Sequence, residues 1–161
     1  MRIGIVSDTH GQREFTRAAV RMLESLEVEL VLHCGDIGSP EIVPLFDQWP
    51  THFVFGNVDY DHQSLSRAIG DSGQFSHETF GELELLDRRI AFLHSDDGRR
   101  FRQTCTSGAW DLVCYGHTHK AEQHREGPTL VINPGAIYRA NPRTLATVTL
   151  PELEAHHVRL E

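Results

Sequence analysis

Carboxylate, amide and imidazole side chains follow five short apolar runs of this chain, each at the point where the run ends. Apolar runs bounded by glycine, aspartate or proline are typical of buried strands. Oxygen and imidazole donors without a thiolate suit Mn²⁺, Fe²⁺, Zn²⁺ or Ni²⁺ better than Ca²⁺ or a structural zinc ion. The candidate metal ligands are Asp8, His10, Asp36, Asn57, His94, His117 and His119.

Two pairs of these candidates are separated by one residue: Asp8 with His10, and His117 with His119. Residues at this spacing point the same way in an extended segment, so each pair can reach one ion. A single pair is weak evidence, because an aspartate at a strand end is usually a turn or cap residue. The prediction therefore depends on all five blocks together. His33 is interpreted as a histidine of the core and not as a ligand.

The elements that must position these residues begin as a parallel βαβ unit, in which an amphipathic helix over Arg13–Leu26 joins the first two strands. A shorter helix over Glu41–Asp47 begins behind Ser39-Pro40. Ligands of open α/β sheets bind beyond the carboxyl ends of the strands, where every candidate lies. The predicted buried strands are Ile3–Val6, Leu30–His33, His52–Phe55, Ile90–His94, Leu112–Tyr115 and Leu130–Ile132.

The second half of the chain predicts a hairpin, in which Phe80–Leu86 and Arg89–Leu93 flank an Asp87-Arg88 turn, and then a helix over Arg99–Ser107. No linker or repeat interrupts the pattern, so residues 1–161 are predicted to form a single α/β domain. Shorter strands, expected to be antiparallel, follow Lys120: Glu122–Arg125, Leu130–Ile132, Leu145–Leu150 and Ala155–Leu160.

The composition, with 39% hydrophobic and 24% charged residues among 161, is normal for a globular chain. The formal net charge of -8 argues against binding to an extended nucleic acid, which needs clustered lysine and arginine. No apolar run approaches the length of a membrane span and no signal-peptide pattern opens the chain, so a cytoplasmic location without membrane contact is expected. Cys34, Cys105 and Cys114 lack disulfide or zinc spacing and are expected to be reduced.

The order of the blocks, D-x-H, G-D, G-N, H and G-H-x-H, resembles that of the calcineurin-like metallophosphoesterase superfamily, and looks closest to its small bacterial and archaeal phosphodiesterases. The resemblance runs from Ile3 to about Tyr138 and includes the Asn133-Pro134-Gly135 turn. It implies a four-layer α/β/β/α sandwich of two mixed sheets. It also implies a hydrolase that acts on a small phosphate ester, a phosphodiester or phosphomonoester.

The resemblance further implies two divalent metal ions, with Mn²⁺ the expected one. Two ions bound side by side lower the pKa of a shared water and clamp the phosphoryl oxygens, so hydroxide attacks the phosphorus without a side-chain nucleophile. By matching position, one ion is held by Asp8, His10, Asp36 and His119, and the other by Asp36, Asn57, His94 and His117, with Asp36 bridging the pair.

Two residues depart from the family pattern. Ser95 follows His94 where glycine is common, and is expected to alter the shape of the loop more than the binding of metal. Val58 stands where many members have a histidine that stabilises phosphate charge or protonates the leaving group. We therefore expect a preference for leaving groups that depart without help. Asp59, Asp61 and His62 are candidate replacements for the missing donor.

Loops around the site, 58–75 and 95–108, are expected to set the substrate specificity. The segment Gln63–Phe80 is a candidate lid or interface of a homo-oligomer. Candidate phosphate contacts in these loops are Arg67, Arg99, Arg100 and Arg102.

Two non-enzymatic hypotheses compete with the hydrolase. Eukaryotic retromer contains a subunit of this fold that serves as a protein-binding scaffold, and such a scaffold predicts weak or single-site metal occupancy. A structural-metal or small-molecule sensor domain predicts stoichiometric metal without turnover. The hydrolase is favoured because all seven ligand positions hold competent residues.

Overall fold

The computed structural model describes residues 1–161 and contains two β-sheets and four helices. The helices are α1 (Arg13–Ser25), the 3₁₀ helix η1 (Pro40–Phe46), α2 (His62–Asp71) and α3 (Gly98–Thr106). The strands are β1 (Arg2–Val6), β2 (Leu30–His33), β3 (Thr51–Phe53), β4 (Phe75–Ser76), β5 (Phe80–Leu85), β6 (Arg88–Leu93), β7 (Leu112–Tyr115), β8 (Ala121–Glu126), β9 (Thr129–Pro134), β10 (Arg143–Thr149) and β11 (Glu154–Leu160).

The first sheet has six strands in the order β11-β10-β1-β2-β3-β4. Strands β1 to β4 run parallel, with Ile3 opposite Leu30 and Val31 opposite Thr51. Strands β10 and β11 add antiparallel at the other edge. Because the parallel strands share one direction, their carboxyl ends meet at one edge, as the predicted βαβ unit requires.

The second sheet has five strands in the order β5-β6-β7-β9-β8. Strands β6, β7 and β9 run parallel, and β5 and β8 pair antiparallel at the edges. The segment Leu130–Ile132, expected among antiparallel strands, therefore pairs parallel to β7 on one side and antiparallel to β8 on the other. The reason is that the chain leaves β7, forms the outer strand β8 and returns as β9 between them.

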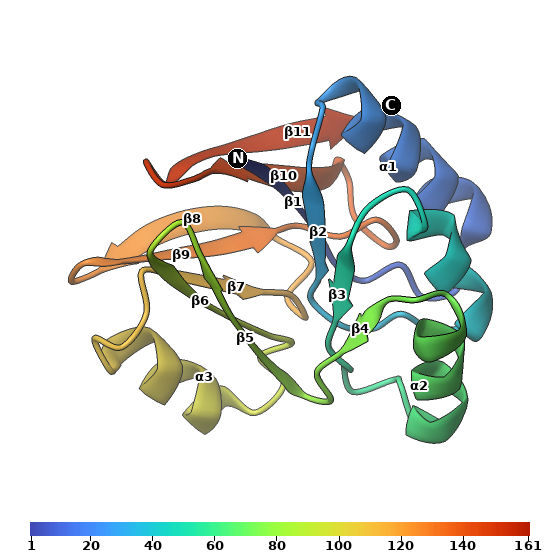
Figure 1. Cartoon of the computed structure of the whole chain (residues 1–161), viewed down its shortest axis with the longest axis horizontal. Coiled ribbons are helices and arrows are strands. Elements are labelled where there is room, and N and C mark those ends of the chain that lie inside the picture. The colour runs from blue at the N-terminus through green and yellow to red at the C-terminus, as the bar shows by residue number, and fades with distance from the viewer.

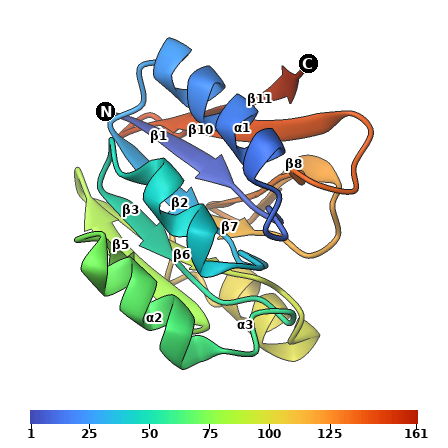
Figure 2. The same cartoon turned by 90° about the vertical axis from the view of Figure 1, so that its right-hand side faces the viewer.

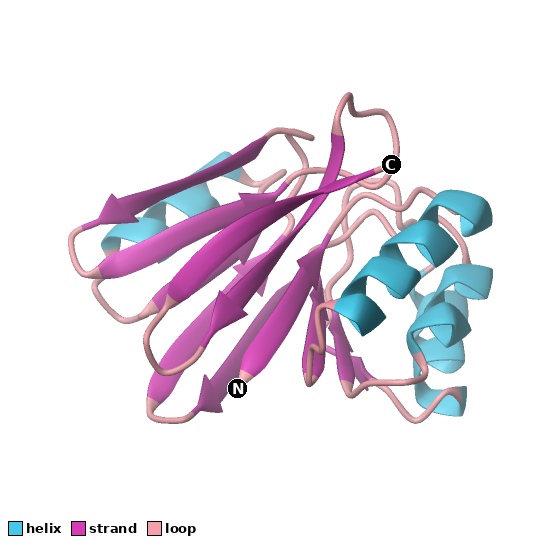
Figure 3. Ribbon diagram, turned by 90° about the horizontal axis from the view of Figure 1, so that it is seen from above, coloured by secondary structure: helices cyan, strands magenta, loops and turns pink.

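The two sheets pack against each other and helices cover their outer faces, so the molecule has four layers. Helices α1 and α2 lie outside the six-stranded sheet and α3 lies outside the five-stranded sheet (Figures 1 and 3). Ile5, Leu32 and Phe92 are fully buried in the apolar layer between the sheets. Leu23 and Phe53 belong to the layer beneath α1, η1 and α2, which Figure 2 shows in front of β1 to β3. The predicted α/β/β/α sandwich of two mixed sheets is confirmed.

Most predicted elements are found within one or two residues of their predicted ends, but the segment after residue 58 differs. A loop was expected over 58–75, whereas the structure has α2 at His62–Asp71. The side chain of Asp61 caps this helix by accepting a hydrogen bond from Ser64 N at 3.0 Å. Leu65 and Ile69 bury one face of the helix. The segment Gln63–Phe80 is therefore largely packed as α2 and β4, and it is not a free lid.

The turn between β5 and β6 lies one residue earlier than predicted. It consists of Leu86 and Asp87, whose φ angles are 49° and 59°. Positive φ at both central residues matches the twist of a two-residue hairpin.

No helix in the structure combines the length and the apolar character that crossing a bilayer requires.

Candidate metal centre

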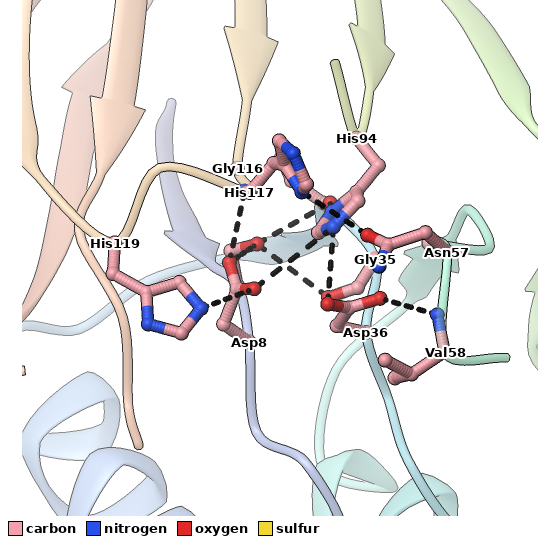
Figure 4. Close-up of polar contacts among 12 residues, drawn as sticks. Asp8, Gly35, Asp36, Asn57, Val58, His94, Gly116, His117 and His119 are labelled. Atoms are coloured by element: carbon pink, nitrogen blue, oxygen red, sulfur yellow. Dashed lines mark hydrogen bonds and ion pairs between the residues drawn. The ribbon is translucent and has the colours of Figure 1, made fainter. Parts of the chain in front are cut away.

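All seven predicted ligands lie at one edge of the paired sheets, in the loops that follow five strands. Side chains from both sheets meet there, with Asp8 and Asp36 between the histidines (Figure 4). Asp8 and His10 follow β1, Asp36 follows β2, Asn57 follows β3, His94 follows β6, and His117 and His119 follow β7.

Two buried carboxylates, Asp8 and Asp36, form the centre of the site, with relative exposures of 0% and 3%. Asp8 Oδ2 accepts hydrogen bonds from Ser7 Oγ at 2.6 Å and His117 N at 3.2 Å. Asp36 Oδ1 accepts one from Val58 N at 3.1 Å. The remaining oxygen of each carboxylate faces imidazole rings. Two buried carboxylates in one site require nearby positive charge.

Backbone carbonyls fix the orientation of two of these rings. His94 Nδ1 lies 2.8 Å from Cys34 O, and His119 Nδ1 lies 3.2 Å from Arg139 O. A carbonyl only accepts, so Nδ1 carries the hydrogen and Nε2 of the neutral ring is an acceptor. Yet His94 Nε2 lies 3.1 Å from Asp36 Oδ2, and His119 Nε2 lies 3.0 Å from Asp8 Oδ1. Acceptors that face each other at this distance need a cation or a proton between them, as in metal sites whose histidines are oriented by a second hydrogen bond.

Three buried atoms of the site have no hydrogen-bond partner: Asp8 Oδ1, His10 Nε2 and His94 Nε2. They converge, because His10 Nε2 lies 3.5 Å from both Asp8 Oδ1 and Asp36 Oδ2, and His94 Nε2 lies 4.0 Å from Asp8 Oδ1. Buried polar atoms in native proteins are nearly always paired. This donor set of oxygens and imidazole nitrogens fits a divalent transition-metal ion.

The donor atoms form two groups within which they lie less than 4.8 Å apart. One group is Asp8, His10 and His119, and the other is Asp8, Asp36 and His94. The remaining two predicted ligands lie against each other at the exposed rim, where Asn57 Oδ1 is 3.1 Å from His117 Nδ1 and the His117 ring is 5.0 Å from that of His94. Asp8 is the member that the two groups share, whereas Asp36, the predicted bridge, belongs to one of them and has its Oδ2 3.5 Å from His10 Nε2 of the other.

The charges of the site shift the pKa of two groups toward the ionised form. Burial alone would raise the pKa of Asp8, but the neighbouring His10 ring, the charge of His94 and the Ser7 hydroxyl lower it to about 2. Burial alone would lower the pKa of His94, but the carboxylates of Asp36 and Asp8 raise it. The site therefore attracts positive charge strongly.

The backbone at this edge is unusual. Five of the seven candidates adopt positive φ angles, a region that costs non-glycine residues free energy and is concentrated at functional sites. Hydrogen bonds from Asp8 N to Gly35 O and from His10 N to Asp36 O, both 3.0 Å, hold part of this backbone in place. The φ angles are 58° at Asp8, 46° at His10, 53° at Asp36, 74° at His117 and 61° at His119.

Two glycines are needed because the ligand loops approach each other closely. A Cβ at Gly56 would collide with the carboxylate and backbone of Asp36, and one at Gly116 would collide with Ser7 Oγ. Each glycine directly precedes a candidate ligand, Asn57 or His117. The glycines therefore allow the loops of the two sheets to bring their ligands together.

The three candidate replacements for the missing proton donor have other roles. The carboxylate of Asp59 is buried and accepts hydrogen bonds from the backbone N–H groups of Ile37, Gly38 and Gly56. Asp61 caps α2. The ring of His62 packs on Phe55 with centroids 4.4 Å apart, and its Nδ1 lies 3.8 Å from a carboxylate oxygen of Glu78. None of them contacts the seven candidate ligands, so the structure does not support their predicted role.

Only one of the four predicted arginines lies beside a candidate ligand. Arg100 and His94 line one cavity of about 220 Å³, and Arg100 is held there by a hydrogen bond to Thr79 Oγ1 and by the ring of Phe80. No contact joins Arg67, Arg99 or Arg102 to the seven candidates. Ser7 and Arg139, which orient Asp8 and His119, have no signal in the sequence that marks them as part of the site.

His33 is a core histidine, as predicted. It is fully buried, its Nδ1 accepts from Gly35 N at 3.3 Å, and its Nε2 lies 3.0 Å from Thr9 Oγ1. The Thr9 hydroxyl donates to Ile37 O at 3.0 Å, so its oxygen accepts from His33 Nε2. Burial lowers the pKa of His33 from 6.5 to about 3. His33 is therefore neutral and supports the ligand loops from inside.

This buried neutral histidine predicts a specific pH dependence of stability. The unfolded chain binds the proton near pH 6.5 and the folded chain only near about 3, so stability present above 6.5 is lost as the pH falls. Between about pH 7.5 and about pH 5, His33 is expected to remove about 2 kcal/mol from the free energy of unfolding. Urea unfolding of metal-free protein at both pH values measures this loss. The variant His33→Gln should show a loss smaller by that amount, and equal losses in the two proteins would contradict the prediction.

Comparison with known proteins gives one consistent family. A family model described as the calcineurin-like phosphoesterase superfamily domain matches residues 1–156. A phosphodiesterase of Methanocaldococcus jannaschii is 31% identical and covers 100% of both chains, and a probable metallophosphoesterase of Bacillus subtilis is 29% identical over 96% of this chain and 85% of the relative.

Solved structures agree with this result. The structure of an archaeal phosphodiesterase superposes with a TM-score of 0.91 at 28% identity and covers 99% of this chain and 100% of that one. Vacuolar protein sorting 29 of Cryptosporidium parvum superposes with a TM-score of 0.69 at 18% identity, over 98% and 95% of the two chains. The second likeness concerns the fold alone.

Proposed function

Because the chain belongs to the calcineurin-like phosphoesterase superfamily, we propose that its metal centre hydrolyses a phosphodiester with the help of two divalent cations. The observation that carries this proposal is the convergence of three buried, unpaired donor atoms, Asp8 Oδ1, His10 Nε2 and His94 Nε2. We propose Mn²⁺ as the metal, and Fe²⁺, Zn²⁺ and Ni²⁺ suit the same mixture of oxygen and imidazole donors. The alternative substrate is a phosphomonoester.

Seven side chains are proposed to hold the cations. Asp36 is proposed to contact both ions, because its Oδ2 lies 3.5 Å from His10 Nε2 and 3.1 Å from His94 Nε2. When bound, the two cations supply an activated water and positive charge for the phosphoryl oxygens. The proposed sets are Asp8, His10, Asp36 and His119 for one ion, and Asp36, Asn57, His94 and His117 for the other.

The other groups of the site orient these ligands. Cys34 O and Arg139 O fix which nitrogen of His94 and His119 faces the carboxylates, and Ser7 fixes Asp8. Orientation of this kind keeps the ligands in place and the imidazoles deprotonated at Nε2 when metal is bound.

No cysteine competes with water as the nucleophile. Cys34 and Cys114 are fully buried, and burial raises the pKa of both thiols. Burial also raises the pKa of the Cys105 thiol, to about 11. All three are neutral thiols at physiological pH, whereas nucleophilic attack requires the thiolate.

The proposed activity is tested by incubating the purified protein with Mn²⁺ and bis(p-nitrophenyl) phosphate, a generic aryl phosphodiester. Release of p-nitrophenolate is expected with Mn²⁺ and not after treatment with EDTA. Metal analysis of the same sample separates the hypotheses. Two bound ions without turnover of any phosphate ester would exclude the proposed hydrolase and favour the sensor hypothesis, whereas weak or single-site occupancy without turnover would favour the scaffold.

The absence of a proton donor at Val58 predicts a steep dependence on the leaving group. Only the backbone N–H of Val58 contacts the site, through Asp36 Oδ1, and its side chain has no proton to give. We expect kcat/KM for methyl p-nitrophenyl phosphate to exceed that for methyl phenyl phosphate by at least about 10²-fold, because general acid catalysis, which contributes about 10²–10⁴-fold, is missing. The variant Val58→His should narrow the ratio, with Leu86→His at the exposed β5–β6 turn as a control outside the site. Equal rates for the two esters in the wild type would show that another donor acts.

A further inference from the structure

The most exposed large apolar side chain of the protein is Tyr60, which is 87% exposed and lies three residues after Asn57. Its loop borders a groove of about 250 Å³ between η1 and α2. We call this the Tyr60 groove. It is lined by residues 38–40, 58–61, 64 and 65, with Pro40, Val58 and Leu65 as its apolar members besides Tyr60.

The Tyr60 groove adjoins the metal centre. Val58 lines the groove, and its backbone N–H donates to Asp36 Oδ1 at 3.1 Å. Asn57, the residue before Val58, lies with its Oδ1 3.1 Å from His117 Nδ1 (Figure 4). One ester arm of a phosphate held at the metal centre can therefore extend into the groove.

The loop that carries Tyr60 is anchored on both sides. The carboxylate of Asp59 accepts from Ile37 N at 3.1 Å, Gly38 N at 2.9 Å and Gly56 N at 2.8 Å. On the other side, Asp61 accepts from Ser64 N at 3.0 Å and caps α2. Because the backbone is held before binding, a ligand that contacts Tyr60 has little loop entropy to overcome.

The lining of the groove determines which ester arm it suits. No lysine or arginine lines it, so a second phosphate has no counter-charge there. Its two carboxylates, on Asp59 and Asp61, accept hydrogen bonds from the backbone. Gly38 and the uncharged serines Ser39 and Ser64 also line it, and its other members are aromatic or aliphatic. This lining favours a flat, uncharged ring that stacks on Tyr60.

From this geometry we infer that the Tyr60 groove binds an aromatic ring on one ester arm of the substrate, and that Tyr60 is a specificity-determining residue. The inference rests on the proposed function, because the phosphate is held at the metal centre. It narrows the substrate class to phosphodiesters that carry an aromatic or heteroaromatic group. Extended polyanions are disfavoured by the same lining, in keeping with the net charge of -8.

The test compares two diesters of equal charge, diphenyl phosphate and diethyl phosphate, by calorimetric titration of the Mn²⁺-loaded protein. We expect diphenyl phosphate to bind about tenfold more tightly than diethyl phosphate, because stacking of its ring on Tyr60 adds binding free energy that an ethyl group does not supply. In Tyr60→Ala the preference should fall to about threefold or less, and in Tyr60→Phe it should persist, because the ring remains. The control is Leu86→Ala, which removes another exposed apolar side chain from the β5–β6 turn and should leave the preference unchanged.

Three outcomes would overturn the inference: an unchanged preference in Tyr60→Ala, an equal loss in Leu86→Ala, or no measurable affinity for either diester. Failure of the proposed catalysis is a separate result. If wild-type protein shows the Tyr60-dependent preference but does not hydrolyse bis(p-nitrophenyl) phosphate, the catalytic proposal is contradicted and the inference about the Tyr60 groove is supported.

Discussion

Replacement of Asp36 by asparagine is expected to lower kcat/KM for bis(p-nitrophenyl) phosphate by at least about 10³-fold, equivalent to about 4 kcal/mol of transition-state stabilisation. Asp36 lies between His10 and His94, with Oδ2 at 3.5 Å and 3.1 Å from their Nε2 atoms. Asparagine has nearly the same shape but no charge, so the affinity of the site for both proposed cations falls. Initial rates at saturating Mn²⁺ measure the effect.

The fold should tolerate this substitution. The side-chain oxygen of asparagine can still accept the hydrogen bond from Val58 N, and its amide can donate to the unpaired Nε2 of His94. The matched control is Asp71→Asn at the end of α2, which is exposed and should retain full activity. Full activity of Asp36→Asn with normal metal content would contradict the proposed mechanism.

Much of the fold was predictable because its strands are buried on both faces. Strands β1, β2 and β7 are almost entirely buried and appear in the sequence as continuous apolar runs bounded by polar turns. Helix α1 has four buried residues at helical spacing, and its predicted start, Arg13, is correct. Because these signals are local and strong, they predict both the βαβ unit and the sheet edge at which the candidate ligands lie.

The elements that escaped prediction give weak local signals. Helix α2 buries only Leu65 and Ile69 and contains Gly70, so its periodicity is short. Strand β4 has two residues, both exposed, and exists because it pairs with β3. The β5–β6 turn places Leu86 at positive φ, which a branched apolar residue rarely adopts.

The candidate site was predictable as a set of residues, but the groups that orient them were not. Positions at the ends of five predicted strands, together with the family resemblance, singled out all seven candidates, and the structure places them at one edge. Cys34 O and Arg139 O fix two histidine tautomers, and a backbone carbonyl has no signature in the sequence. Asp59 and Asp61 cannot be told apart in the sequence of this acidic loop. In the structure Asp59 is 3% exposed and accepts hydrogen bonds from three backbone N–H groups, whereas Asp61 caps α2.

The same unpaired atoms predict that metal removal strongly destabilises the protein. Without cations, Asp8 Oδ1, His10 Nε2 and His94 Nε2 stay buried without a partner, and five candidate ligands hold left-handed backbone. A cation that binds only the folded state stabilises it by about 2.7 kcal/mol at a free concentration of 100 times its Kd, so two sites give about 5 kcal/mol. For a chain of this size each kcal/mol shifts Tm by about 2–4 °C, and the expected rise is about 10–20 °C.

Differential scanning calorimetry of the protein with EDTA and with excess Mn²⁺ measures this rise. Asp36→Asn provides the decisive comparison, because its metal-free Tm should remain near that of the wild type while most of the Mn²⁺-dependent rise disappears. A structural scaffold with one weak site would show at most half of the rise. If Mn²⁺ left the wild-type Tm unchanged, the buried donors would have to be satisfied by protons on the histidines, which the raised pKa of His94 favours in the absence of metal. The rise in Tm therefore decides between a cation and a proton as the partner of these atoms, independently of any assay of turnover.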